Sequence, residues 1–339
     1  MNDKYPNLAK TMINMWNSRF SKTIHKRDEG FAINFSPIKI CSFLNSINRN
    51  SNKKLKIKEY KNPNLNFWIY SLDNTKLAAS IWLNKKESNK WVIGVHGYNS
   101  NRLDVLYLIW HYQSLGYNIL TFDFRNHGIS DSNCITWGYK EKWDLIAAIN
   151  WLIKNYDVRL IGLVGTSMGA FTTNYFLLTE HELIKKANIK WAISDSSYMS
   201  VKNLLQRMIK DYSPKFLTNL SKDVLDNILE IYKNEYDVDL TKLDFVKLIS
   251  INTKYIPVLY IHNRLDKVTS YLDSFRMYQM KNNIENSFAN QIEIYDHGSH
   301  HTKSIIEFEN EYITKSLNFV KLQEKKIITN NNKIYKILI

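Results

Sequence analysis

The sequence predicts an α/β fold in which helices cover both faces of a mostly parallel central sheet and a helical cap is inserted. Short segments rich in Ile, Leu and Val alternate with segments whose apolar residues recur at helical spacing. The strand-like segments are apolar on successive residues, which is typical of strands buried on both faces. Residues 198–253 have apolar residues at helical spacing and no convincing strand. Because a structureless loop of that length is uncommon, we expect a helical cap there.

The apolar patterns predict eight strands, four helices between them and four regions of the chain. The first two strand-like segments flank the turn Asp73-Asn74 and predict a hairpin. The expected strands are Phe67–Ser71, Leu77–Leu83, Trp91–Val95, Asn118–Phe122, Leu160–Val164, Lys190–Ser194, Pro257–His262 and Gln291–Tyr295. The expected helices are Leu103–Leu115, Lys140–Lys154, Ala170–Leu178 and Tyr271–Lys281. The predicted domains are an N-terminal helical extension (1–60), a core (61–197 and 254–322), the cap (198–253) and a C-terminal tail (323–339).

The N-terminal extension begins with an amphipathic helix. Met12, Met15, Trp16 and Phe20 share one face, which we expect to dock on the core; contact with a membrane is the alternative. Polar residues interrupt this segment, so it is not a secretory signal. No run of 18 apolar residues exists, and no transmembrane helix is expected.

The formal net charge of +14 raises the question of a polyanionic partner. The lysines are scattered, so we interpret the charge as a solvated basic surface and expect no nucleic-acid partner; peripheral membrane contact is the alternative. The two cysteines, Cys41 and Cys134, form no CxxC pair, which argues against a disulfide framework or a zinc site. This usage suits a reducing compartment, and we expect a cytoplasmic protein.

The strongest motif is a strand that runs into Gly165-Thr166-Ser167-Met168-Gly169 and continues as a helix. A sharp strand-to-helix turn of this type exposes the serine hydroxyl above the sheet, and its glycines leave room for neighbouring elements. The helix N-terminus also stabilises nearby negative charge. Ser167 is therefore the candidate nucleophile; a glycine turn with a solvated serine is the alternative.

A serine nucleophile needs a general base, and the base needs an orienting carboxylate. For a nucleophile on such a turn, the acid and then the histidine follow in chain order, each after a late strand. Asp266 follows the strand at 257–262 and is the candidate acid; an ordinary turn aspartate is the alternative.

Three histidines follow the last strand and compete for the role of base. His297 lies closest to the strand end, while His300 and His301 lie beyond Gly298, where a base could lean toward the serine. We favour His301, then His300, then His297. The serine and acid upstream favour a triad over a metal site, so no metal or organic cofactor is expected.

An oxyanion hole needs two backbone N–H groups. One should come from Met168, directly after the nucleophile. The other should come from Tyr98, in the loop after the strand at 91–95, where Gly97 lets the chain turn back. His96 precedes the serine and ends a strand, so we interpret it as a residue that braces this loop.

Four stretches carry a wider resemblance: His96-Gly97-Tyr98, 123–130, 137–144 and 165–170. Together they resemble the α/β-hydrolase superfamily, over roughly residues 66–320. More closely, the chain is similar to bacterial serine hydrolases related to S9 peptidases and cinnamoyl esterases. The resemblance implies the α/β-hydrolase fold.

The resemblance also implies roles for charged residues beside the site. Asp123, Arg125 and His127 would brace the adjacent loop, and Glu141 and Asp144 would tie a helix start to that loop.

The same family supports one choice of base and raises one alternative acid. The pattern G-x-x-H-x-x-S matches Gly298, His301 and Ser304, which favours His301. Some members take the acid from the position of Asp195, after the strand at 190–194. The chain departs from the family at Asn126, where glycine is usual, and at Asp73-Asn74 in place of Asp-Gly.

These residues predict a serine hydrolase that cleaves an ester, thioester or amide of a small-molecule acyl substrate through an acyl-enzyme. Carboxylic ester hydrolysis is the leading hypothesis, and aromatic residues in the cap suggest an apolar acyl group. The alternatives are an S9-like serine peptidase and a non-catalytic binding protein on a hydrolase scaffold.

Overall fold

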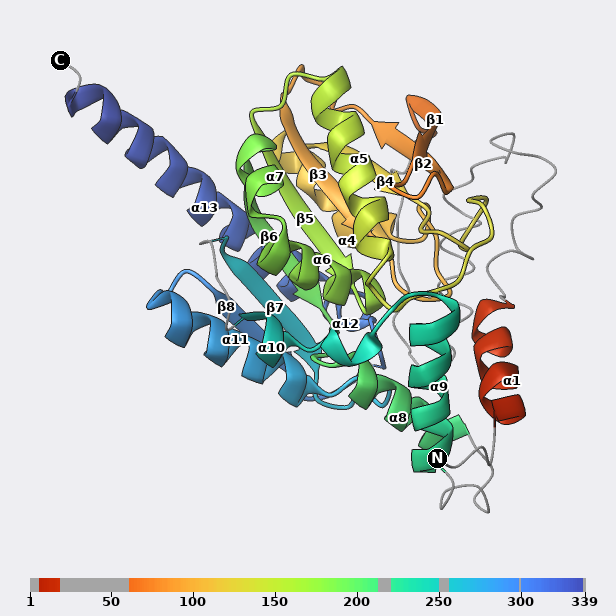
Figure 1. The fold of residues 1–339 in the computed structure, drawn as a ribbon. Coiled ribbons are helices and arrows are strands. Elements are labelled where there is room, and N and C mark those ends of the chain that lie inside the picture. The colour runs from red at the N-terminus through yellow and green to blue at the C-terminus, as the bar shows by residue number, and fades with distance from the viewer. Residues whose placement is uncertain (1–5, 19–60, 213–220, 250–255, 299, 338–339) are drawn as a thin grey trace.

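A computed structural model describes residues 6–18, 61–212, 221–249, 256–298 and 300–337. Eight strands form one sheet in the order β1-β2-β4-β3-β5-β6-β7-β8 (Figure 1). β2 pairs antiparallel with both of its neighbours, and all other neighbouring pairs are parallel. The strands are β1 Leu65–Tyr70, β2 Lys76–Trp82, β3 Lys90–Val95, β4 Asn118–Phe122, β5 Leu160–Thr166, β6 Ile189–Asp195, β7 Val258–Asn263 and β8 Gln291–Tyr295.

Every strand expected from the sequence is present. The reason is visible on β3, whose side chains enter two separate cores on alternate residues. Trp91, Ile93 and Val95 belong to one core and Val92 to the other. A strand buried on both faces must be apolar throughout, and this is the pattern that the sequence displays.

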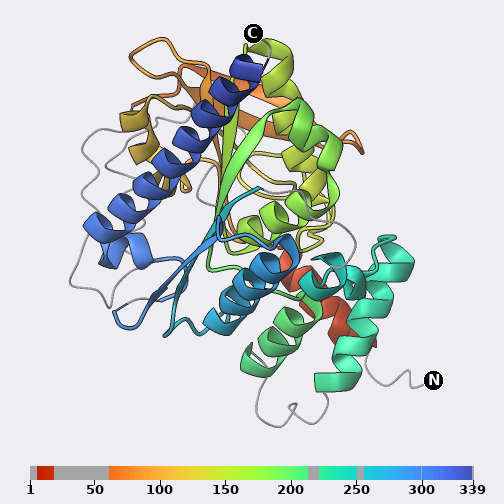
Figure 2. The same cartoon turned by 90° about the vertical axis from the view of Figure 1, so that its left-hand side faces the viewer.

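Helices cover both faces of the sheet. α5 (Glu141–Asn155), α6 (Met168–Thr179) and α7 (His181–Lys186) lie on one side, and α13 (Glu309–Ile337) lies on the other (Figure 2). α11 (Tyr271–Glu285) packs on β7 and β8, and α12 (Ser304–Glu307) precedes α13. Residues 323–337 of the expected C-terminal tail continue α13.

The expected helix Leu103–Leu115 was wrong in extent. The chain forms a short α4 (Leu106–Ile109) and then a 3₁₀ helix, η2 (Trp110–Leu115). The Asn101 side chain accepts the N–H groups of Leu103 and Asp104, so these residues form a turn that precedes the helix. Gly116 ends the segment with φ of 81°.

The inserted segment is helical where it is described: α8 (Val201–Tyr212), α9 (Ser221–Glu235), η4 (Leu240–Lys242) and α10 (Phe245–Ile249). The N-terminal helix α1 (Pro6–Asn17) packs against α9, and the two helices lie side by side in both views (Figures 1 and 2). Among the described residues, no helix combines the length and apolar character needed to cross a bilayer.

The face that α1 buries differs in part from the expected one. Met12 and Trp16 are buried as expected, and Ala9 and Ile13 join them. Met15 is 52% exposed, because it lies at the edge of this face. Phe20 and Cys41 fall outside the described residues, whereas Cys134 is buried and free.

Candidate active site

Ser167 occupies a strained turn between β5 and α6. Its φ of 52° and ψ of −118° are unusual for a residue with a side chain, and strain of this kind concentrates at functional sites. Two backbone hydrogen bonds hold the turn: Ser167 N–H donates to Asp195 C=O (2.9 Å), and Phe171 N–H donates to Ser167 C=O (3.0 Å). The serine is thus fixed at the carboxyl end of the sheet.

The two glycines of the motif allow close backbone packing, as the sequence predicts. A Cβ atom on Gly169 would overlap the carbonyl oxygen of Val95, and one on Gly165 would overlap the carbonyl oxygen of Gly169. No flexible side chain could move aside to relieve either overlap. The start of α6 can therefore lie directly against the ends of β3 and β5 only without side chains at these positions.

His301 contacts both Ser167 and Asp266. Its Nε2 lies 2.7 Å from Ser167 Oγ, and its Nδ1 lies 2.7 Å from Asp266 Oδ2. The three residues come from the loops that follow β5, β7 and β8, whose carboxyl ends meet at one edge of the sheet. With the ring proton on Nδ1, the serine hydroxyl donates to Nε2 and the ring donates to the carboxylate.

Asp266 is fully buried at its side chain and is held as an acceptor. Val268 N–H (2.8 Å) and Thr269 N–H (3.0 Å) donate to Oδ1, and the Thr269 hydroxyl lies 3.0 Å from Oδ2. Burial alone would raise the pKa of this carboxyl, but the charge of His301 and hydrogen bonds from His262 and His301 hold the pKa below its ordinary value. The carboxylate is therefore ionised wherever the protein is folded near neutral pH.

Two supporting residues of this site were missed by the sequence reasoning. His262 is buried at the end of β7, with Nδ1 2.8 Å from Ser274 Oγ and Nε2 3.3 Å from Asp266 Oδ2. Thr269 reaches Asp266 and donates to the backbone of Ser196. A histidine in a buried strand four residues before the candidate acid was the available signal.

The other histidines of the last loop lie elsewhere. His297 packs its ring against Phe308, with the ring centroids 5.1 Å apart. His300 is exposed and lines a cavity beside Ser167. Within the described residues, no group of three or more His, Cys, Asp or Glu side chains is placed to hold a metal ion.

Asp195 is not placed as the partner of His301. Its Oδ2 accepts from Tyr312 OH (2.8 Å) and its Oδ1 accepts from Ser196 Oγ (2.8 Å). Ser196 Oγ in turn lies 3.3 Å from the N–H of Thr302, next to the favoured base. Asp195 therefore supports the loop that carries His301 indirectly, through Ser196.

Tyr98 and Met168 both border the space in front of Ser167. Met168 begins α6, so its N–H has no acceptor one turn earlier in the helix. The loop that carries Tyr98 lies close to the serine: a Cβ atom on Gly97 would be only 3.1 Å from Ser167 Cβ. His96 braces this loop: its Nε2 accepts the N–H of Phe124 (2.9 Å), as expected.

The charged residues implied by the family resemblance make several separate contacts beside the site. Arg125 donates to both carboxylate oxygens of Asp144, with the shortest contact 2.6 Å, and to Asp73 (2.6 Å). Asp123 pairs with Arg102 (2.6 Å). Glu141 accepts the N–H groups of Thr136 and Gly138, which ties the start of α5 to the preceding loop.

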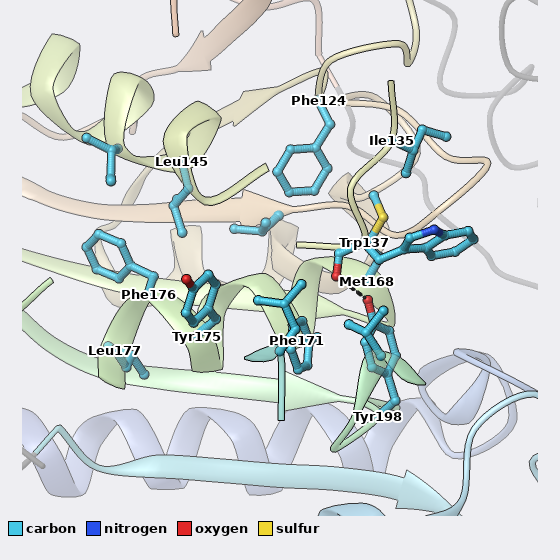
Figure 3. Packing of buried hydrophobic residues seen from close by; sticks show 14 of the residues in the cluster. Phe124, Ile135, Trp137, Leu145, Met168, Phe171, Tyr175, Phe176, Leu177 and Tyr198 are labelled. Atoms are coloured by element: carbon cyan, nitrogen blue, oxygen red, sulfur yellow. Dashed lines mark hydrogen bonds between the residues drawn. The ribbon is translucent and has the colours of Figure 1, made fainter. Parts of the chain in front are cut away.

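Two cavities meet at Ser167 and His301. The first, of about 510 Å³, includes Asp104, Tyr107 and Lys303 in its lining. The second, of about 530 Å³, is mainly apolar. Its apolar lining consists of Met15, Trp16, Trp137, Met168, Tyr198, Leu204, Met208 and Val268. We call it the apolar chamber; Figure 3 shows Trp137, Met168 and Tyr198 converging beside the start of α6.

Asp104 makes a testable contribution to stability. Burial, followed by the charge of Asp123, raises its pKa to about 7. A pKa above the unfolded value means that stability is lost as pH rises from about 4 through 7. Asp104→Asn removes this penalty and keeps an oxygen that accepts from Asn101. We expect a gain of roughly 2–4 kcal/mol at pH 8 and little change at pH 4.

Urea unfolding of wild type and Asp104→Asn at both pH values checks this expectation. The exposed Asp157→Asn substitution is the matched control. An equal effect of Asp104→Asn at the two pH values would rule out the ionisation account.

Comparisons with known proteins bear on the fold. The family model for the alpha/beta hydrolase fold matches residues 90–230. The uncharacterized protein YqkD of Bacillus subtilis is 38% identical over 82 residues, a match that spans 24% of this chain and only 27% of that relative. The esterase Pf2001 of Pyrococcus furiosus is 25% identical with a TM-score of 0.59, over 86% of this chain and 97% of the esterase.

An acylaminoacyl peptidase of Pyrococcus horikoshii has the same fold, at 20% identity and a TM-score of 0.55. That likeness covers 79% of this chain and 42% of the peptidase. The family model and the structural neighbours agree with the expected architecture, and the α/β-hydrolase fold of the chain is confirmed.

Proposed function

We propose that the protein is a serine hydrolase that cleaves carboxylic esters through an acyl-enzyme intermediate. The observation that carries the proposal is the chain of two 2.7 Å contacts that joins Ser167 Oγ, His301 and Asp266. Neutral serine is a weak nucleophile, and a base within hydrogen-bond reach is what activates it.

The proposed reaction has two halves. Ser167 Oγ attacks the ester carbonyl while His301 Nε2 takes the serine proton, and Asp266 stabilises the resulting imidazolium. The N–H groups of Tyr98 and Met168 bind the oxyanion. His301 then gives its proton to the departing alcohol, and in the second half it takes a proton from the water that attacks the acyl-enzyme.

The two cavities suggest how an ester would lie. The apolar chamber suits an apolar acyl group, and the cavity that holds Asp104 and Lys303 leaves room for the alcohol. The esterase of Pyrococcus furiosus is matched over nearly its whole length, which supports ester over peptide hydrolysis as the proposal.

A fluorophosphonate probe tests the nucleophile. We expect the wild type to be labelled and Ser167→Ala to be unlabelled, because only an activated serine attacks the probe. The exposed Ser114→Ala substitution is the control and should be labelled like wild type. An unlabelled wild type would instead favour a binding protein on this scaffold.

A panel of p-nitrophenyl esters and aminoacyl p-nitroanilides tests the bond that is cleaved. The proposal expects kcat/KM to be higher for the esters by at least about tenfold beyond their difference in spontaneous hydrolysis, which corresponds to about 1.4 kcal/mol of transition-state binding. Preference for the anilides would replace the esterase proposal with the peptidase alternative.

A further inference from the structure

The N-terminal helix α1 is anchored to the loops that surround Ser167. Tyr98 OH donates to the carbonyl of Trp16 (3.0 Å), and Asn126 Nδ2 donates to the carbonyl of Asn17 (3.1 Å). The N–H of Ile135 donates to Asn17 Oδ1 (3.0 Å). Three separate segments of the core therefore hold the last turn of α1.

One of these anchors belongs to the site itself. Tyr98 lies in the loop after β3 that borders the serine, whereas Asn126 lies in the loop after β4. Asn126 has φ of 57°, a conformation that glycine adopts most easily, yet the residue here carries an amide. The Asn126 amide donates to α1, a contact that the glycine usual in the family could not make.

Apolar packing reinforces the anchors. Trp16 and Trp137 meet edge to face, with ring centroids 5.4 Å apart, and both are almost fully buried. Trp137 donates its indole N–H to Tyr232 of α9 (3.2 Å), the helix on which α1 packs. α1, Trp137 and α9 thus form one continuous layer beside the catalytic serine.

This layer closes one side of the apolar chamber. Met15, Trp16 and Ser18 line the chamber together with residues of the core and of α8. Met15 is half exposed and lies at the edge of the buried face of α1, so its side chain can change size without disturbing the core. Trp16 is the larger and more deeply buried of the two.

We propose that α1 is the specificity-determining wall of the acyl site, and that Met15 and Trp16 limit the length of the acyl group that the chamber accepts. This inference rests on the proposed esterase function. A longer acyl group requires space that these two side chains occupy, whereas an acetyl group does not reach them.

The test is the ratio of kcat/KM for a p-nitrophenyl ester of a long acyl chain to that for p-nitrophenyl acetate. We expect Met15→Trp to lower this ratio for the octanoate by about tenfold. Met15→Ala should raise it for the dodecanoate by several-fold, since single methylene groups in a pocket change kcat/KM by about 10- to 200-fold. Asn14→Trp is the matched control: it places the same ring on an exposed neighbouring position and should leave the ratio unchanged.

Activity on the acetate reports whether each variant is folded and separates the possible failures. Unchanged ratios in both Met15 variants, in an enzyme that hydrolyses esters, would overturn the role of α1 alone. A shift of equal size in Asn14→Trp would also overturn it. A wild type that hydrolyses no ester would overturn the proposed function, and the role of α1 with it.

Discussion

Replacement of His301 by alanine is expected to lower kcat for ester hydrolysis by a factor of about 10⁴–10⁶, the range for loss of the base in a serine–histidine pair. The reason is geometric. In the structure, His301 is the histidine whose ring contacts both Ser167 Oγ and Asp266 Oδ2. Without it, the serine proton has no acceptor and the leaving alcohol has no donor. Steady-state rates on p-nitrophenyl acetate measure the loss.

His300→Ala is the matched control for this prediction. His300 is the adjacent residue, of the same type, but it is exposed and lines the cavity that also holds Asp104 and Lys303. We expect kcat to stay within a few-fold of wild type, with any change in KM reflecting the alcohol side of the substrate. A loss of similar size in both variants, or a larger one in His300→Ala, would reassign the base.

The choice among the three histidines shows where sequence reasoning reached its limit. Chain order after the nucleophile places the base in the loop that follows β8, but His297, His300 and His301 all lie there. Which of the three reaches Ser167 depends on the conformation of that loop. Tyr107 OH donates to the carbonyl of Thr302 (2.9 Å), and this contact joins residues 195 positions apart. No local pattern encodes such a contact.

The sheet, in contrast, could be read from the sequence because its signal is local. Each buried strand is a short run of apolar residues, and such a run by itself indicates burial. The expected helix 103–115 starts later in the structure for the opposite reason: apolar spacing cannot show that the Asn101 side chain holds Leu103 and Asp104 in a turn. The position of α1 was equally hidden, because it depends on Tyr98 and Asn126, which come from distant loops.

The network around Arg125 gives the largest expected effect on stability. Its guanidinium is fully buried and joins Asp144 at the start of α5 to Asp73 in the turn between β1 and β2. Arg125→Met is expected to lower the free energy of unfolding by about 3–5 kcal/mol, because it leaves Asp144 as an uncompensated buried charge. Urea unfolding at pH 8 measures the loss.

Two further variants identify the cause. Lys10→Ala is a control that removes an exposed ion pair. Lys10 Nζ lies 2.9 Å from Glu235 Oε1, and both side chains are about half exposed. This substitution should cost less than about 1 kcal/mol, because water already solvates both charges. Combining Arg125→Met with Asp144→Leu should recover part of the loss, since the second substitution removes the stranded carboxylate.

The pH dependence separates charge from packing in Arg125→Met. Burial raises the pKa of Asp144, and Arg125 opposes that rise. Without Arg125 the folded-state pKa moves further above the unfolded value, so the added penalty is absent below about pH 4 and grows as pH rises. If charge is the cause, the stability difference from wild type should therefore be smaller at pH 5 than at pH 8. If lost packing is the cause, the difference should be the same at both pH values, and the role assigned to the Arg125–Asp144 pair would be wrong.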